Sequence, residues 1–141
     1  MAKYSWMIHY VSGEVACEQC GRMEGSIKSR MCDAHTHGLD EFGSPELQVV
    51  VAMPPDVVGW ILNSVGEMVR DGLVLKDGMS ISGLLANDAE LRVYKTTAYD
   101  GAPVFRLIVP DENFMFPPES KQYPYSAQYE SPYIDKKRRM S

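Results

Sequence analysis

The sequence lacks several features that would place it in a common functional class. It has no apolar run near the ~20 residues that a membrane-spanning helix needs, and its first residues, MAKYSWMIHY, lack the pattern of a signal peptide. It also has no Gly-x-Ser-x-Gly elbow, no glycine-rich phosphate loop and no dinucleotide fingerprint. We therefore expect a cytoplasmic protein without a membrane segment, outside these hydrolase and nucleotide-binding classes.

Positive charge is also scarce. Fourteen Lys and Arg stand against 19 Asp and Glu, which gives a net charge of -5. Because binding to a phosphate backbone needs clustered cations, we expect no nucleic-acid partner, and a small molecule or another protein is left. A run of four cations, Lys136 to Arg139, is expected to be part of a solvated basic tail at residues 135–141.

Cysteine is present only three times, which is an odd count in a small chain. A disulfide framework is therefore not expected, and metal ligation or reduced thiols remain. The 141 residues, 45% of them hydrophobic, are enough for one domain with a real core. We predict a single domain at residues 1–134, whose proline- and tyrosine-rich segment 111–134 packs irregularly over that core.

The order of apolar residues predicts an α+β fold. Residues 46–53 are almost continuously apolar, which indicates a central strand buried on both faces. Pro54 and Pro55 end this strand and begin a helix, which Arg70 and Gly72 close. Further strands are expected at residues 4–11, 90–98 and 103–109. The prediction is a largely antiparallel sheet of four to six strands with one principal helix.

The residues with metal-binding chemistry lie close together in the sequence. Cys17 and Cys20 form a Cys-x-x-Cys pair, and Cys32 and His35 supply a second pair after an eleven-residue gap. Such a Cys₃His set has ordinary zinc spacing. Residues 12–31 show no periodicity, and a loop of about 20 residues without regular structure would need something to order it. A bound ion would do so for a zinc loop over residues 12–37. We therefore predict zinc, held by these four residues, as the cofactor of a zinc-ordered loop.

Two other uses of the histidines stay open. His35 and His37 point to one side of an extended segment, so His37 is an alternative ligand, and a His-x-His pair is also a metal signature of amidohydrolases. The third histidine, His9, is expected to be a hydrogen-bonded strand residue rather than a ligand. The two resulting hypotheses are a zinc-containing binding or regulatory domain with structural zinc, and a metal-dependent hydrolase or other small-molecule enzyme.

One stretch, CDAHTHGLDEFGSPELQVVVAMP, resembles a bacterial family, domain of unknown function 4262. The positions that carry the resemblance are Thr36, Gly38, Leu39, Pro45 and Glu46. The resemblance continues through the proline-led helix to the late segment RLIVPD and covers about residues 15 to 130. It implies no activity, cofactor or partner. For Glu46 we expect a structural role, capping or pairing where the strand begins, because no partner base can be named.

Overall fold

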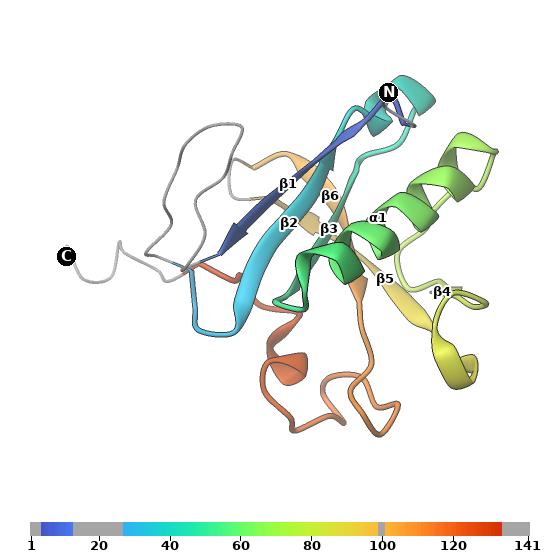
Figure 1. Cartoon of the computed structure of the whole chain (residues 1–141). Helices are drawn as coiled ribbons and strands as arrows, with labels where there is room; N and C mark the ends of the chain where they lie inside the picture. The colour runs from blue at the N-terminus through green and yellow to red at the C-terminus, as the bar shows by residue number, and fades with distance from the viewer. Residues whose placement is uncertain (1–3, 13–26, 99–100, 134–141) are drawn as a thin grey trace, which may run out of the picture.

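A six-stranded sheet is the main element of the computed structural model, which describes residues 4–12, 27–98 and 101–133 (Figure 1). The strand order is β1-β2-β3-β6-β5-β4, with β3 and β6 parallel and every other neighbouring pair antiparallel. The strands are β1 (Met7–Ser12), β2 (Met31–His37), β3 (Glu46–Val51), β4 (Ser80–Ile81), β5 (Leu91–Thr97) and β6 (Pro103–Ile108). The predicted α+β class, with a largely antiparallel sheet and one principal helix, is confirmed.

The helix α1 (Pro55–Arg70) crosses one face of this sheet (Figure 1). It begins with proline at its first position and carries Arg70 in its last turn, as the sequence predicts. Its apolar side chains recur every three or four residues and are buried against the sheet. This core includes Ile61, Leu62 and Val65 of the helix with Leu47 and Val49 of β3.

The opposite face of the sheet is partly covered by the C-terminal segment. Ala127 and Tyr133 of this segment form a second apolar cluster with residues of β1, β2 and β3. Tyr133 also forms an isolated bridge with Ile27. The prediction that the tyrosine-rich segment packs irregularly over the core is therefore confirmed as far as residue 133, and the predicted tail at 135–141 lies outside the described residues.

The N-terminal region differs from the expected loop. Met31–His37, the last part of the predicted zinc loop over residues 12–37, form strand β2, which pairs with both β1 and β3, so these residues are a strand rather than a loop. Residues 13–26, which include Cys17 and Cys20, lie outside the described residues. Among the residues that are described, no helix has the length and apolar character to cross a membrane.

Candidate metal centre

Strand β2 presents two sets of side chains because successive residues point to opposite faces of the sheet. Cys32, Ala34 and Thr36 form one set, and the first two belong to the core under α1. The other set is Asp33, His35 and His37, on the face that α1 does not cover.

The register of β1 against β2 adds the third histidine to this second set. His9 is directly opposite His35, and Met7 is opposite His37. Residues opposite each other in an antiparallel pair share a face of the sheet. All three histidines of the chain are therefore neighbours.

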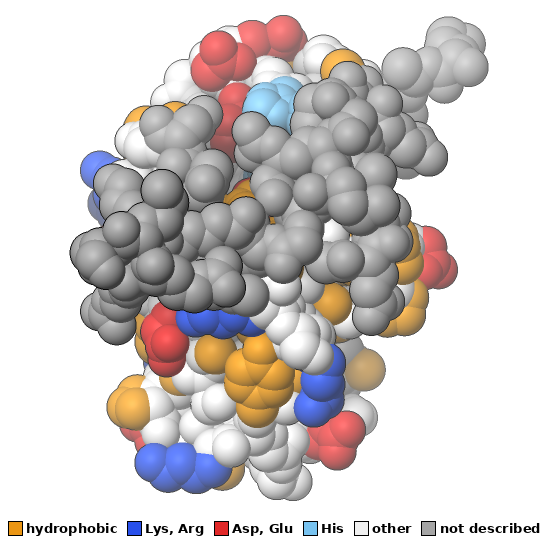
Figure 2. All heavy atoms as spheres, turned by 90° about the vertical axis from the view of Figure 1, so that its left-hand side faces the viewer, with side chains coloured by type: hydrophobic (Ala, Val, Ile, Leu, Met, Phe, Trp, Pro, Cys, Tyr) orange, Lys and Arg blue, Asp and Glu red, His pale blue; other side chains and the backbone are white. Residues whose placement is uncertain are grey.

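The three imidazole rings lie in contact. Ring centroids are 4.1 Å apart for His9 and His37, 4.8 Å for His35 and His37, and 5.5 Å for His9 and His35. One nitrogen of each ring can be chosen so that all three lie within 4.8 Å of one another. Histidine side chains reach the surface next to acidic side chains in Figure 2. An ion could therefore approach the group from solvent.

Asp33 orients the central ring of this group. Its Oδ1 lies 2.9 Å from Nδ1 of His35 and accepts a second hydrogen bond from Nε2 of Gln48 at 2.9 Å. Its Oδ2 accepts a hydrogen bond from the hydroxyl of Tyr133. Burial by itself raises the pKa of Asp33, but the hydrogen bond and charge of His35, with hydrogen bonds from Gln48 and Tyr133, outweigh it and lower the pKa to about 2. Asp33 is thus ionised at neutral pH and favours the His35 tautomer with a proton on Nδ1.

The electrostatics of His9 favour its neutral form. Burial lowers the pKa of His9 below its usual value, and the neighbouring His37 and His35 lower it further, while Asp33 acts in the opposite direction. A neutral imidazole is the form that binds a metal ion. His9, expected to be a structural strand histidine, is therefore placed with the candidate ligands.

The structure does not bring Cys32 and His35 together. These two predicted ligands are three positions apart on β2 and lie on opposite faces of the sheet. The Cys32 thiol is fully buried and donates to the carbonyl oxygens of Val49 and Val51, both at 3.5 Å. Burial, and secondly the charge of Asp33, raise the pKa of Cys32 to about 12, so the thiolate that binds zinc is disfavoured here. Cys17 and Cys20 lie outside the described residues, so their role as zinc ligands stays a prediction.

A row of polar residues continues from the histidines across the sheet. His35 is opposite Gln48, Gln48 is opposite Arg106, and Arg106 is opposite Tyr94. Gln48 connects Arg106 of this row to Asp33 beside it, since its Nε2 donates to Asp33 and its Oε1 accepts from Nε of Arg106 at 2.8 Å. The sequence interpretation missed this row. A signal was present, because Gln48 and Arg106 interrupt two otherwise apolar strands.

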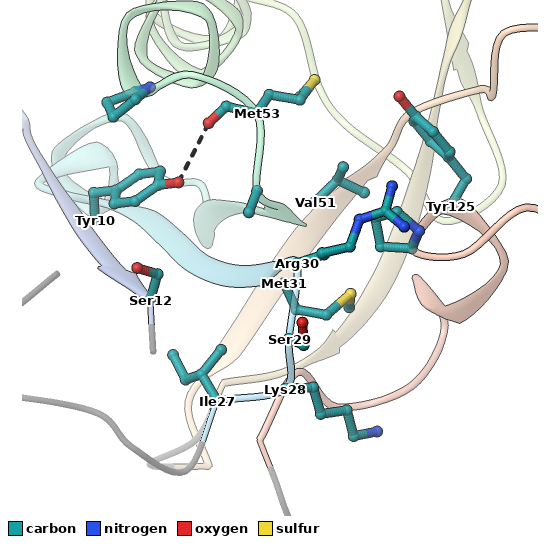
Figure 3. A pocket seen from close by; sticks show the side chains of 13 residues that line it. Tyr10, Ser12, Ile27, Lys28, Ser29, Arg30, Met31, Val51, Met53 and Tyr125 are labelled. Carbon is teal, nitrogen blue, oxygen red and sulfur yellow. Dashed lines mark hydrogen bonds between the residues drawn. The ribbon is translucent and has the colours of Figure 1, made fainter. Parts of the chain in front are cut away.

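A cavity of about 480 Å³ lies beside β1 and β2 (Figure 3). On one side the Tyr10 hydroxyl donates to the carbonyl of Met53 at 3.2 Å, and Arg30 and Tyr125 lie on the other. The Arg30 guanidinium is 5.9 Å from the ring centroid of Tyr123. The walls are largely apolar, and the cation of Arg30 already contacts the Tyr123 ring. We therefore take the histidine group, rather than this cavity, as the candidate site.

Comparisons with protein-family models, with curated proteins and with solved structures find no match for this chain. The resemblance to domain of unknown function 4262 therefore stays a prediction.

Proposed function

We propose that the protein binds a divalent transition-metal ion through His9, His35 and His37, and that zinc is the ion it takes. The observation that carries this proposal is the convergence of the chain's three histidines from two paired strands, with candidate ligand nitrogens within 4.8 Å of one another. Imidazole nitrogen is a common ligand of zinc and copper ions.

The separation of the rings is compatible with an ion between them. Zinc–nitrogen bonds of 2.0–2.1 Å in tetrahedral geometry place ligand nitrogens about 3.3 Å apart. The three nitrogens lie within 4.8 Å, so each needs to move by about 1 Å or less on metal binding. Small rotations of the imidazole rings are sufficient for such a movement.

The contact between His35 and Asp33 supports the proposal independently. A histidine ligand usually donates its second ring nitrogen to a carboxylate or carbonyl, which fixes its tautomer and makes it a stronger ligand. Asp33 is buried and its Oδ1 lies within hydrogen-bonding distance of Nδ1 of His35, so in this proposal Nε2 of that ring is the metal ligand.

The described residues offer three ligands, and three ligands favour an open site over a closed structural one. A tetrahedral ion held by three histidines keeps its fourth position for water or substrate, whereas structural zinc has four protein ligands. An ion in such a position lowers the pKa of bound water and polarises carbonyl groups. Metal-dependent hydrolysis of a small molecule is therefore the second candidate function, in place of a purely structural role for the metal.

Metal content of purified variants tests the proposal. Wild type is expected to bind about one equivalent of zinc, and His9→Ala, His35→Ala and His37→Ala to lose most of it. Asp33→Asn is expected to bind zinc about 10- to 100-fold more weakly, because it removes the carboxylate that orients His35. A protein loaded with cobalt should show no thiolate charge-transfer band.

The double variant Cys17→Ser/Cys20→Ser is the matched control, since it removes thiols and leaves the three histidines. It should bind zinc as wild type does. Loss of zinc from this variant, with zinc retained by His9→Ala, would support the Cys₃His prediction and overturn the three-histidine site. For the second candidate, ester hydrolysis that depends on zinc in wild type and is absent from His37→Ala supports catalysis.

A further inference from the structure

A second binding site is indicated at Arg106, one position along the polar row from Gln48. The Arg106 side chain lies in the middle of the sheet, and the residue is only 3% exposed. Arginine is seldom buried to this degree without a partner of opposite charge.

The hydrogen bonds of Arg106 leave one edge of its guanidinium group open. Its Nε donates to Oε1 of Gln48, and its Nη1 donates to the carbonyl oxygens of Gln128 and Glu130, each at 2.8 Å. A guanidinium has five N–H donors, so these three bonds leave the two of Nη2. Within residues 4–12, 27–98 and 101–133, Nη2 makes no hydrogen bond.

The charge of Arg106 is also uncompensated at close range. All three acceptors are neutral, and among the described residues no carboxylate forms an ion pair with this guanidinium. Asp33 is the nearest acidic group in the network, but Gln48 stands between the two. A buried cation in this setting is costly unless an anion joins it.

A cavity of about 260 Å³ lies against this side chain. Among the described residues, no acidic side chain lines this cavity. Gln48 and Arg106 line it together with four residues that carry hydroxyl groups, Thr96, Thr97, Ser131 and Tyr133. Tyr129, whose ring packs edge-on against Tyr94 at 4.7 Å between centroids, gives it an apolar wall. The cavity therefore combines a buried cation, several hydroxyls and an aromatic surface.

We propose that this cavity binds a small organic carboxylate, with Nη2 of Arg106 donating to the carboxylate and the hydroxyls of Thr96 and Ser131 close to it. A guanidinium N–H forms a strong, charge-assisted hydrogen bond with a carboxylate, so Nη2 alone can anchor one. The single positive charge of Arg106 balances one negative charge on the ligand. The nearby Asp33 carboxylate repels a second negative charge, so a carboxylate monoanion fits better than doubly charged phosphate. The volume lies below the ~300 Å³ of typical ligand pockets, which indicates a short-chain acid.

Nuclear magnetic resonance with metal-free, ¹⁵N-labelled wild-type protein tests this site. Titration with sodium butyrate at neutral pH should give saturable shifts of the Arg106 side-chain N–H signals and of the Thr96 and Thr97 amides. Sodium phosphate and sodium chloride at equal ionic strength should give weaker shifts that do not saturate.

Two variants separate recognition by Arg106 from general charge. Arg106→Lys keeps the charge but loses the second edge of donors, and it should weaken butyrate binding at least 10-fold. Arg92→Lys is the control, because Arg92 lies on β5 with its guanidinium 4.2 Å from the ring centroid of Phe116, and it should bind butyrate as wild type does.

The wild-type titration decides the matter even if Arg106→Lys does not fold. If no saturable shift appears at Arg106, Thr96 or Thr97, the carboxylate site is wrong. Equal weakening by Arg106→Lys and Arg92→Lys would also overturn it, since that pattern reports net charge. Neither outcome depends on the histidine site, because the protein is free of metal.

Discussion

The indole ring of Trp6 lies against the backbone of Gly66 in the middle of α1. A Cβ atom at Gly66 would be 2.7 Å from Cζ2 of Trp6, which is too close for any real contact. The ring cannot easily move, because its Nε1 donates to Oδ1 of Asn63 at 2.8 Å and it stacks on Tyr4 at 4.7 Å between centroids. Gly66 thus permits the close packing of Trp6 against the helix.

Replacement of Gly66 by alanine should destabilise the protein. Overpacking of a filled core costs about 1–3 kcal/mol, which outweighs the gain of about 1 kcal/mol when alanine replaces glycine in a helix. Gly59→Ala is the matched control, because a Cβ atom at Gly59 would be 4.0 Å from Cδ1 of Ile8, which is an ordinary contact. This variant should be slightly more stable than wild type. Urea unfolding measures both. Equal free energies of unfolding for the two variants would show that Trp6 does not fill this space.

The sequence predicts most of the apolar architecture but not strand β2, which carries two of the three candidate ligands, His35 and His37. Long apolar or alternating runs mark β3, β5, β6 and α1, because burial alone decides their structure. In β2 the core-facing residues include Cys32, Ala34 and Thr36, which are small or weakly apolar. Its period is therefore faint, and the pairing with β1 and β3 determines its conformation.

The candidate site could be predicted only in part for the same reason. That His35 and His37 point to the same side can be predicted from an extended backbone alone, because they are two residues apart. That His9 joins them depends on the register of β1 against β2, and no local pattern specifies which residue of one strand faces His35 of the other. Conversely, the expected pairing of Cys32 with His35 followed sequence spacing, whereas the period of a strand places them on opposite faces.

The buried thiol of Cys32 should react slowly in the native protein. Its pKa is raised to about 12 and its side chain is inaccessible, so both thiolate population and access are low. In the Cys17→Ser/Cys20→Ser variant, reaction with a disulfide reagent should be at least ~100-fold slower than in denaturant, since it needs local opening. Immediate reaction of one thiol in the native variant would contradict the burial of Cys32.

Acid should remove the contribution of Asp33 to the stability of the metal-free protein. Its folded pKa of about 2 lies below the ordinary value of 3.8, so the stabilisation is present above about pH 4 and is lost as the pH falls toward 2. The shift corresponds to about 2 kcal/mol. The free energy of unfolding of wild type should exceed that of Asp33→Asn at pH 5. This difference should shrink by about 2 kcal/mol as the pH is lowered to the most acidic value at which both proteins still fold. Parallel pH curves for the two proteins would contradict it.

Glu46 gives the last prediction, because it connects the residues on which the family resemblance depends. Its carboxylate accepts hydrogen bonds from the hydroxyl of Thr36 at 2.8 Å and from the backbone N–H groups of Gly38 and Leu39, both at 3.2 Å. The Thr36 hydroxyl in turn accepts from the backbone N–H of Leu47 at 2.9 Å. These contacts agree with the structural role expected for Glu46 and describe how the chain turns between β2 and β3.

Replacement of Glu46 by alanine should lower the free energy of unfolding by about 1–3 kcal/mol, because three partly buried donors lose their acceptor. Glu46→Gln keeps one acceptor oxygen and should cost less. Glu41→Ala is the control, since Glu41 accepts only an exposed bond from Ser5 at 3.1 Å among the described residues, and its effect should stay within about 0.5 kcal/mol. Urea unfolding measures all three. If Glu46→Ala is as mild as Glu41→Ala but abolishes zinc binding, Glu46 has a functional role instead. The positions on which the resemblance depends would then mark a binding site rather than a turn.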